Sequence, residues 1–413
     1  MNNIGNCVIA QSGGPTSVIN SSLAGVMSKV FESDNIKTVY GAINGIQGLM
    51  KENFLDLTKF KGDEQAIKTL KLSPAMYLGS CRYKLPSDYE NSEDFKTIFE
   101  IFKKYDIKYF FYIGGNDSMD TVAKLSIYAE KIGFDIAIMG VPKTIDNDLA
   151  CIDHTPGFGS AAKFIATSML EVAHDTYIYD MKTVLIVEIM GRNAGWLTAS
   201  SVLARNEYSK APHLIYLPER AFNEDKFIDD INALLSKQQH VIVAVSEGIK
   251  NEAGQYISAK SEQVDQFGHV MLNGTGKYLE QLVSNKIGCK VRSIELNVLQ
   301  RSAGHIASLT DSNEAYELGR QAANAALNGK TGEMAIVTRT SNSPYTVNYS
   351  TASIHDIANV EKTIPDNWIN EAGNDVTEEL VDYLRPLIEG EANHTFTNGL
   401  PTYLPVTHLV PKK

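Results

Sequence analysis

The stretch FYIGGNDSMD, residues 111–120, joins an apolar run to a helical pattern through two consecutive glycines. The same arrangement occurs earlier in AQSGGPTSVIN, residues 10–20. A glycine pair between a strand and a helix lets backbone N–H groups approach an anion at the helix N-terminus, where the dipole also favours negative charge. Either pair alone could be only a tight turn, and Ser118 only a helix cap. Two such loops in one chain strengthen the interpretation as anion-binding loops.

Apolar runs alternate with amphipathic segments along the whole chain. This alternation predicts an α/β protein with mostly parallel sheets, whose functional residues gather at the carboxyl ends of the strands. The expected strands cover residues 8–10, 109–113, 136–141, 183–189, 214–217 and 241–245. The expected helices cover residues 16–31, 118–132, 160–174, 223–237 and 313–327. The region after about residue 340 is richer in Asn, Thr and Ser, and we predict loops and peripheral helices there.

Length and composition limit the possible classes of protein. A chain of 413 residues is longer than one hydrophobic core usually supports, so we expect two domains. Its composition of 43% hydrophobic and 21% charged residues is typical of a globular protein. A net charge of -11 without a basic run argues against general nucleic-acid binding. The four cysteines lack the spacing of metal ligands. The sequence shows neither a signal sequence nor an apolar stretch long enough to span a membrane. We therefore expect reduced thiols and a cytoplasmic protein with no membrane partner.

The stretch VPKTIDNDLA, residues 141–150, follows a third apolar run and carries a lysine and two aspartates. Alternate residues of an extended segment point the same way, so Asp146 and Asp148 are expected to face one site while Asn147 faces elsewhere. One carboxylate as general base and the other as a Mg²⁺ ligand would suit phosphoryl transfer. The structural alternative is an Asp turn that begins a helix.

A fourth strand ends in VEIMGRNAGW, residues 187–196, and further charged residues follow it. Met190 alone would be a core residue and Arg192 alone a solvated charge. SEG, residues 246–248, offers Glu247 at another strand end, and VRSIELNVLQRSAGH contributes Arg292 and Arg301. Guanidinium groups suit sugar phosphates because their planar forks grip phosphate oxygens.

Taken together, these motifs resemble those of the phosphofructokinase family, specifically its pyrophosphate-dependent branch. The motifs SGG, GG-x-D-S, PKTIDND, MGR, SEG and QRS appear in order between about residues 5 and 340. The resemblance implies two Rossmann-like three-layer domains with the active site in the cleft between them. The expected boundaries are 1–160 plus about 300–345 for the phosphoryl-donor domain, 161–299 plus part of 346–375 for the sugar-phosphate domain, and about 376–413 for a C-terminal extension.

The resemblance also implies a reaction and a set of site residues. The reaction is reversible, Mg²⁺-dependent transfer of a phosphoryl group from pyrophosphate to the C1 hydroxyl of fructose 6-phosphate, in glycolysis or gluconeogenesis. The implied catalytic residues are Asp146, which resembles the base, with Asp148, Thr144 and Lys143. The implied donor-binding residues are Gly14, Arg82, Gly115, Asn116, Asp117 and Lys143, and the metal would rest on Asn116 and Asp148. The implied sugar-phosphate contacts are Thr144, Asp146, Met190, Gly191, Arg192, Glu247, Arg292 and Arg301.

Two positions bear on the phosphoryl donor. ATP-dependent members usually read GGDGS and PGTIDND, whereas this chain has Asp117 and Lys143 in place of the two variable glycines. A carboxylate about 4 Å from a phosphate charge costs roughly 4 kcal/mol at an effective dielectric near 20. Asp117 should therefore repel a nucleotide and fill its space, while Lys143 supplies a point charge for compact pyrophosphate and for the leaving phosphate.

Three departures from the family pattern leave alternatives open. Asn116 stands where most relatives have an aspartate near Mg²⁺, Val298 replaces a histidine or tyrosine that helps bind the 6-phosphate, and residues 182–183 are Lys-Thr instead of including an arginine. The alternatives are an ATP-dependent 6-phosphofructokinase, a pyrophosphate-dependent kinase that prefers sedoheptulose 7-phosphate, and a catalytically silent sugar-phosphate sensor. The resemblance further implies that Arg292 reaches a neighbouring subunit's site, so we expect a homodimer or homotetramer.

Overall fold

The computed structural model describes residues 4–89, 91–257, 272, 274–407 and 409–410, and the chain forms two compact units. Unit 1 contains residues 1–160, 301–361 and 390–413. Unit 2 contains residues 161–300 and 362–389. The chain therefore passes from one unit to the other four times. The segment expected to form a C-terminal extension is divided, because residues 376–389 belong to unit 2 and the rest to unit 1.

Unit 1 is built on a seven-stranded sheet with the order β11-β10-β5-β4-β1-β2-β3. The strands are β1 Gly5–Gln11, β2 Ile36–Ala42, β3 Phe54–Asp56, β4 Ile107–Gly114, β5 Ala137–Pro142, β10 Glu333–Asn342 and β11 Tyr345–Ser353. The central strands pair in parallel, and only the two edge strands, β3 and β11, pair antiparallel to their neighbours. A short ribbon of β12 Phe396–Thr397 and β13 Leu400–Pro401 lies apart from this sheet.

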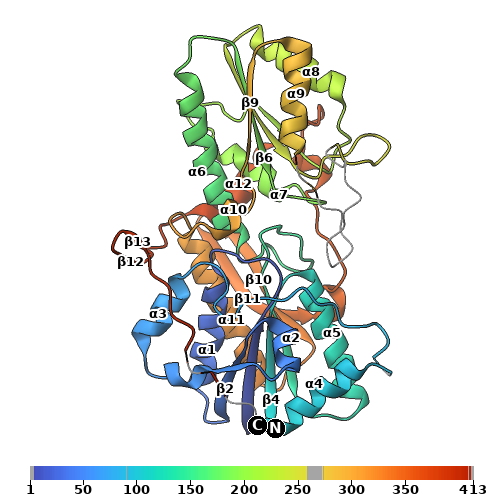
Figure 1. The fold of residues 1–413 in the computed structure, drawn as a ribbon, viewed down its shortest axis with the longest axis vertical. Helices are drawn as coiled ribbons and strands as arrows, with labels where there is room; N and C mark the ends of the chain where they lie inside the picture. Colours follow the sequence, from blue (N-terminus) through green and yellow to red (C-terminus); the bar gives the residue numbers. More distant parts are fainter. Residues whose placement is uncertain (1–3, 90, 258–271, 273, 408, 411–413) are drawn as a thin grey trace. The chain divides into compact units, whose positions relative to one another are not determined.

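Helices cover the unit 1 sheet, and Figure 1 shows α1, α3 and α11 on one side of it with α4 and α5 on the other. The helices are α1 Ile19–Phe31, α2 Gly45–Met50, α3 Glu64–Leu72, α4 Glu93–Lys104, α5 Asn116–Lys131, α10 Leu299–Ser302 and α11 Leu309–Leu327, with 3-10 turns at Leu57–Phe60 and Ile354–Asp356. Strands β1 and β4 carry buried side chains on both faces, as expected for a sheet covered on both sides.

Unit 2 is built on a four-stranded parallel sheet with the order β7-β8-β6-β9. The strands are β6 Thr183–Ile189, β7 Leu214–Tyr216, β8 His240–Ser246 and β9 Lys290–Glu295. The helices are α6 Phe158–Tyr177, α7 Trp196–Ser200, α8 Glu224–Leu235, α9 Thr275–Ile287 and α12 Glu378–Leu384, with 3-10 turns at Ser201–Ala204, Asp366–Trp368 and Arg385–Ile388. Figure 1 shows α6 on one side of the sheet and α8 and α9 on the other. The predicted α/β class with mostly parallel sheets is confirmed.

The region after residue 340 was expected to form loops and peripheral helices, and that prediction is wrong for its first part. Strands β10 and β11 form a long antiparallel hairpin in which Asn342 pairs with Tyr345 and Glu333 with Ser353. Alternating exposed and half-buried residues along β11 match a strand at the edge of a sheet. Most residues of β11 are polar, so the sequence did not indicate a strand there.

Two glycines allow α1 and α11 to pack closely in unit 1. A Cβ atom added at Gly25 would lie 2.0 Å from the carbonyl oxygen of Tyr316, and one at Gly319 would lie 2.2 Å from that of Ser22. Neither backbone can move away without separating the two helices. The absence of side chains at these two positions therefore sets the distance between the helices.

We predict that Gly319→Ala lowers the free energy of unfolding. The added methyl group overpacks the contact between α1 and α11, which costs about 1–3 kcal/mol. Alanine also has a better helix propensity than glycine, and this offsets at most about 1 kcal/mol of that cost. Urea denaturation of the variant measures the change. Glu317→Ala, on the exposed side of the same helix, is the control and should stay within about 0.5 kcal/mol of the parent. An unchanged midpoint for Gly319→Ala would contradict the close packing.

Candidate active site

Three loops of unit 1 begin at the same edge of its sheet. Strand β1 pairs with β4 up to Gln11 and Ile113, and β4 pairs with β5 up to Gly114 and Pro142, all in parallel. The carboxyl ends of these strands are therefore neighbours, and the two glycine loops and the PKTIDND segment leave side by side. The sequence predicted that functional residues gather at strand ends, and these three motifs do so.

Lys143 is buried among the three loops and is 3% exposed. Its ammonium donates a hydrogen bond to the carbonyl oxygen of Gly14 (2.8 Å), and a Cβ added at Gly13 would lie 3.0 Å from Nζ. Burial lowers the pKa of Lys143 to about 8, Asp146 and Asp148 oppose this shift, and Arg301 adds to it. Lys143, which the sequence predicted on the donor side, is thus a poorly solvated ammonium beside a glycine loop.

The segment 143–148 is a bend and not the extended segment that the sequence suggested. Asn147 has a positive φ of 55°, and its fully buried side chain accepts the N–H of Thr155 (3.0 Å). Asp146 and Asp148 on either side are only half-buried. Asn147 is thus buried while the two aspartates are partly exposed, and a turn produces this difference instead of an extended segment. Asn and Asp tolerate such left-handed backbone better than other non-glycine residues, because their short side chains bond locally.

Thr144 contacts the backbone and side chain of Asp146. Its hydroxyl accepts the Asp146 N–H at 3.1 Å and lies 3.4 Å from the Asp146 carboxylate. This hydroxyl restrains the conformation of the expected base. Thr144 is itself 8% exposed, so it is fixed by packing as well as by hydrogen bonds.

The second glycine loop carries Asn116 and Asp117 at the start of α5. The Asn116 side chain donates to the carbonyl oxygen of Val360 (2.9 Å) and accepts from the N–H of Asn359 (2.6 Å). The Asp117 carboxylate lies 3.7 Å from the ammonium of Lys84, and both side chains are about half exposed. Lys84 was not among the expected site residues, and its ammonium partly offsets the negative charge of Asp117.

Two further expected site residues belong to this region: Arg82, expected on the donor side, and Arg301, expected on the sugar-phosphate side. Ser80 donates to the carbonyl oxygen of Gly13 (2.7 Å), which brings the GSCRY segment and the exposed Arg82 toward the loop. A Cβ added at Gly14 would lie 2.7 Å from the guanidinium of Arg301. Arg301 was expected among the sugar-phosphate contacts, yet in unit 1 it lies beside Gly14 and Lys143.

In unit 2 the MGR and SEG motifs meet at the ends of β6 and β8. Ile189 pairs with Ser246, and the Ser246 hydroxyl donates to the carbonyl oxygen of Gly191. The carboxylate of Glu247 lies 3.4 Å from the N–H of Gly191. A Cβ added at Gly191 would lie 2.8 Å from the carbonyl oxygen of Ala194. The structure therefore brings Gly191, its chain neighbours Met190 and Arg192, and Glu247 together at these strand ends.

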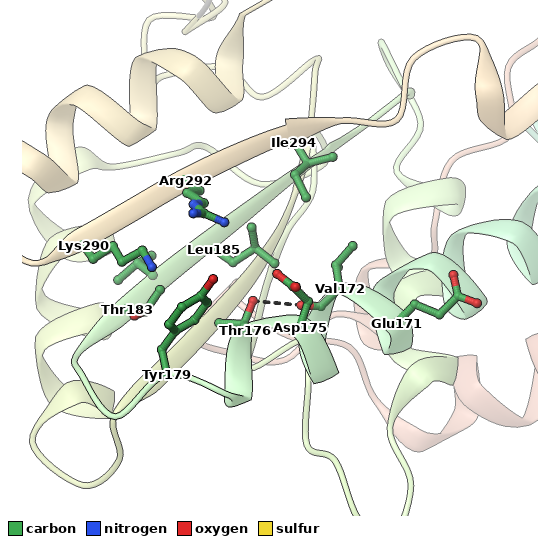
Figure 2. A pocket seen from close by; sticks show the side chains of 11 residues that line it. Glu171, Val172, Asp175, Thr176, Tyr179, Thr183, Leu185, Lys290, Arg292 and Ile294 are labelled. Atoms are coloured by element: carbon green, nitrogen blue, oxygen red, sulfur yellow. Dashed lines mark hydrogen bonds between the residues drawn. The ribbon is translucent and has the colours of Figure 1, made fainter.

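Arg292 is not part of that group. It pairs in register with Leu185 in the middle of β9, and Figure 2 shows it at a pocket between β6, β9 and α6. The pocket has a volume of about 220 Å³ and is also lined by Tyr179 and Asp175. Lys290, two residues before Arg292, lies 3.6 Å from the centroid of the Tyr179 ring. Within its own unit Arg292 therefore does not reach the strand-end site.

Glycine loops, a buried lysine and paired aspartates at the carboxyl ends of parallel strands are typical of α/β proteins that transfer phosphoryl groups. The family model described as phosphofructokinase matches residues 6–326. The chain belongs to the phosphofructokinase family.

Several relatives resemble this chain over nearly its whole length. A pyrophosphate--fructose 6-phosphate 1-phosphotransferase of Methylococcus capsulatus is 39% identical over 99% of this chain and 97% of its own. One from Rhodospirillum rubrum is 41% identical over 93% of this chain and 94% of its own. A crystal structure of a pyrophosphate-dependent phosphofructokinase from Marinobacter aquaeolei has a TM-score of 0.89 and 38% identity, covering 99% of this chain and 98% of its own. No described helix is long and apolar enough to cross a membrane.

We predict that kcat/KM for pyrophosphate falls as the pH rises through about 8, the pKa of Lys143. The ammonium is charged below this pH and neutral above it, and kcat/KM reports the ionisation of the free enzyme. Lys143→Arg should have a lower rate but no alkaline loss in this range, because guanidinium stays protonated. The same alkaline loss in Lys143→Arg would assign the ionisation to another group or to pyrophosphate itself.

We also predict that Asn116→Asp destabilises the protein without improving its use of Mg²⁺. A carboxylate cannot donate to the carbonyl oxygen of Val360, so the variant should lose about 1 kcal/mol of unfolding free energy. Thermal denaturation and the Mg²⁺ concentration at half-maximal rate are the two measurements. Asn116→Ala is the uncharged control. Tighter Mg²⁺ dependence with unchanged stability would instead place this side chain at the metal.

Proposed function

We propose that the protein catalyses reversible transfer of a phosphoryl group from pyrophosphate to the C1 hydroxyl of fructose 6-phosphate, giving fructose 1,6-bisphosphate and phosphate. The observation that carries the proposal is the buried ammonium of Lys143, which lies at the Gly13–Gly14 loop and interacts electrostatically with Asp146 and Asp148. The relatives named for this reaction match almost the entire chain. Such an activity belongs to glycolysis or gluconeogenesis.

In the proposed reaction the C1 oxygen attacks a phosphorus atom of pyrophosphate, and the bond from that phosphorus to the bridging oxygen breaks. Asp146 takes the proton of the hydroxyl, and phosphate leaves with the electron pair of the broken bond. Lys143 stabilises negative charge on the donor oxygens, and its burial strengthens this interaction. The backbone N–H groups at Gly14 and Gly115 are suited to orient the donor.

We propose Mg²⁺ as the metal, held chiefly by Asp148 and by the substrates. No group of three or more His, Cys, Asp or Glu side chains suited to a metal occurs among the described residues. This fits Mg²⁺, which usually takes one or two protein carboxylates and completes its shell with substrate phosphates and water. The bonds from Asn116 to the backbone at residues 359–360 favour a structural role for that amide. Bound Mg²⁺ would neutralise charge on the transferring oxygens.

The sugar phosphate is proposed to contact Met190, Gly191, Arg192 and Glu247, which the structure gathers in unit 2. Arg292, from the middle of β9, would reach a sugar phosphate only in a neighbouring subunit's site, which requires a homodimer or a larger homo-oligomer. Val298 is 48% exposed, and an apolar residue at that place leaves the phosphate end of the sugar less tightly specified. Sedoheptulose 7-phosphate is therefore the second candidate acceptor.

The decisive experiment compares initial rates with pyrophosphate and with ATP, and then with fructose 6-phosphate and with sedoheptulose 7-phosphate. We expect turnover with pyrophosphate and little with ATP. Asp146→Ala should lower kcat by at least about 100-fold if Asp146 is the base. Preference for ATP would refute the assignment of the donor, and no turnover with either donor would favour a sugar-phosphate sensor.

We further predict that Asp117→Gly gains activity with ATP, because the change removes both a charge and the volume that would meet a nucleotide. The ratio of kcat/KM values for ATP and pyrophosphate is the measurement. Lys84→Gln is the matched control, since it removes the cation 3.7 Å from Asp117 and should make discrimination against ATP stronger. A ratio that does not change in Asp117→Gly would show that this carboxylate does not select the donor.

A further inference from the structure

The loop that carries the two aspartates returns to the core through residues 153–157, which we call the return limb. At its centre His154 is 2% exposed and lies between two carboxylates. Nδ1 is 2.7 Å from the Asp153 carboxylate and Nε2 is 2.5 Å from that of Glu314 on α11. A histidine held in this way donates a hydrogen bond from each ring nitrogen, and only the imidazolium form can do so.

Charged and titratable groups on β10 and β11 surround this histidine and its partner Glu314 on α11. From β10, Arg339 donates to the Asp153 carboxylate at 3.0 and 3.2 Å. From β11, the Tyr345 hydroxyl donates to Glu314 at 2.7 Å, and the pKa of Tyr349 is raised first by burial and then by the negative charge of Glu314. The two carboxylates are balanced by His154 and Arg339, so the charges of the cluster sum to zero.

The cluster is charged at neutral pH. Although burial alone would lower the pKa of His154, the carboxylates of Glu314 and Asp153 outweigh it and raise that pKa to about 9. Since this value exceeds that of an unfolded histidine, the pairing stabilises the fold fully below about pH 6.5 and is lost as pH rises through about 9.

The return limb holds the aspartate segment through backbone and side-chain bonds. Thr155, next to His154, donates its N–H to the Asn147 side chain (3.0 Å) and its hydroxyl to the Thr144 carbonyl oxygen (3.1 Å). Thr144 in turn donates its N–H to the carbonyl oxygen of Pro156 (3.2 Å). A displacement of His154 is therefore passed to residues 144–147, which contain the expected base.

We propose that His154 is a positioning residue: its pairing with Glu314 on α11 fixes the return limb and thereby sets the position of Asp146 for proton removal. The inference rests on the proposed function. His154 does not contact substrate, and it acts through the Thr155 bonds. Removing its charge leaves the Asp153 and Glu314 carboxylates facing each other, and their repulsion pushes the limb away from α11.

The first test is His154→Gln, a neutral side chain of similar size. We expect kcat to fall by about tenfold to a hundredfold, the scale of a small misplacement of a catalytic group. The KM for pyrophosphate should stay within about twofold, because Lys143 and the glycine loop are not displaced. Rates are measured well below the unfolding temperature, after circular dichroism has shown that the variant is folded, and are normalised to active sites titrated with radiolabelled substrate.

The matched control is His213→Gln in unit 2. His213 is half-buried, it accepts a backbone N–H from Ile242 (2.9 Å), and burial lowers its pKa to about 4, so it is neutral. Its replacement should alter stability without changing kcat. If both variants lost the same fraction of kcat, the loss in His154→Gln would reflect a general loss of folded structure and not a role in positioning Asp146.

The second test concerns the pairing itself. Glu314→Gln removes one carboxylate and should lower the pKa of His154, so that its ring nitrogens, followed by ¹⁵N NMR of histidine-labelled protein, deprotonate nearer to neutral pH than in the parent. An additional alkaline loss of kcat should appear over the same range. The double variant His154→Gln/Glu314→Gln should recover part of the kcat lost in His154→Gln, since it relieves the carboxylate repulsion.

Three outcomes would overturn the inference: parental kcat in folded His154→Gln, equal losses of kcat in His154→Gln and His213→Gln, or a neutral His154 ring at pH 7 in the parent. Failure of the proposed function is distinguishable, because the unmodified protein would then show no turnover with pyrophosphate and fructose 6-phosphate. The NMR titration reports on the pairing in either case.

Discussion

The two hydrogen bonds accepted by the buried carboxylate of Asp311 connect the aspartate loop to the core of unit 1. Asp311 accepts the N–H of Gly157 at 2.9 Å and that of Ser160 at 2.8 Å, and it is 2% exposed. Burial raises its pKa to about 6, so these N–H groups bond an ion that has lost most of its water. Without such bonds the first turn of α6 and the end of the loop would have unsatisfied backbone donors. These bonds fix the end of the loop, and the His154 and Thr155 contacts hold the part before it.

The donor side of unit 1 concentrates charge in a small, poorly hydrated space. Lys143 and Arg301 lie near the first glycine loop, while Asp146 and Asp148 lie close enough to Lys143 to influence its ionisation. In such surroundings electrostatic interactions are stronger than in water, and misplacement is costly for the same reason. The backbone bonds around Asn147 and Thr144 therefore matter to chemistry as well as to folding.

Much of the fold and of the site could be predicted because strand ends carry local signals. Apolar runs followed by Gly-Gly, Lys-Thr-Ile-Asp or Met-Gly-Arg mark where parallel strands stop, and parallel pairing makes those ends neighbours. Contacts between distant residues have no such signal. The pairing of Lys84 with Asp117, and the placement of Arg301 beside Gly14 while Arg292 stays in mid-strand, depend on register and helix position. Strand β11 escaped prediction because an edge strand needs apolar residues on one face only.

Because each unit is made of segments far apart in the sequence, neither unit can finish folding until late in translation. The first 160 residues contain most of the unit 1 sheet but lack α11, whose small residues pack on α1, and they lack β10, which pairs with β5. Helix α11 begins only at residue 309 and β10 only at residue 333, so more than a third of the chain is synthesised between residue 160 and these pieces, and unit 2 is completed only by residues 362–389. The nascent protein must therefore carry an uncovered apolar helix face for much of its translation. Contacts of such long sequence separation form slowly and leave intermediates open to aggregation, so an internal break in the chain or a stalled ribosome yields neither unit in finished form.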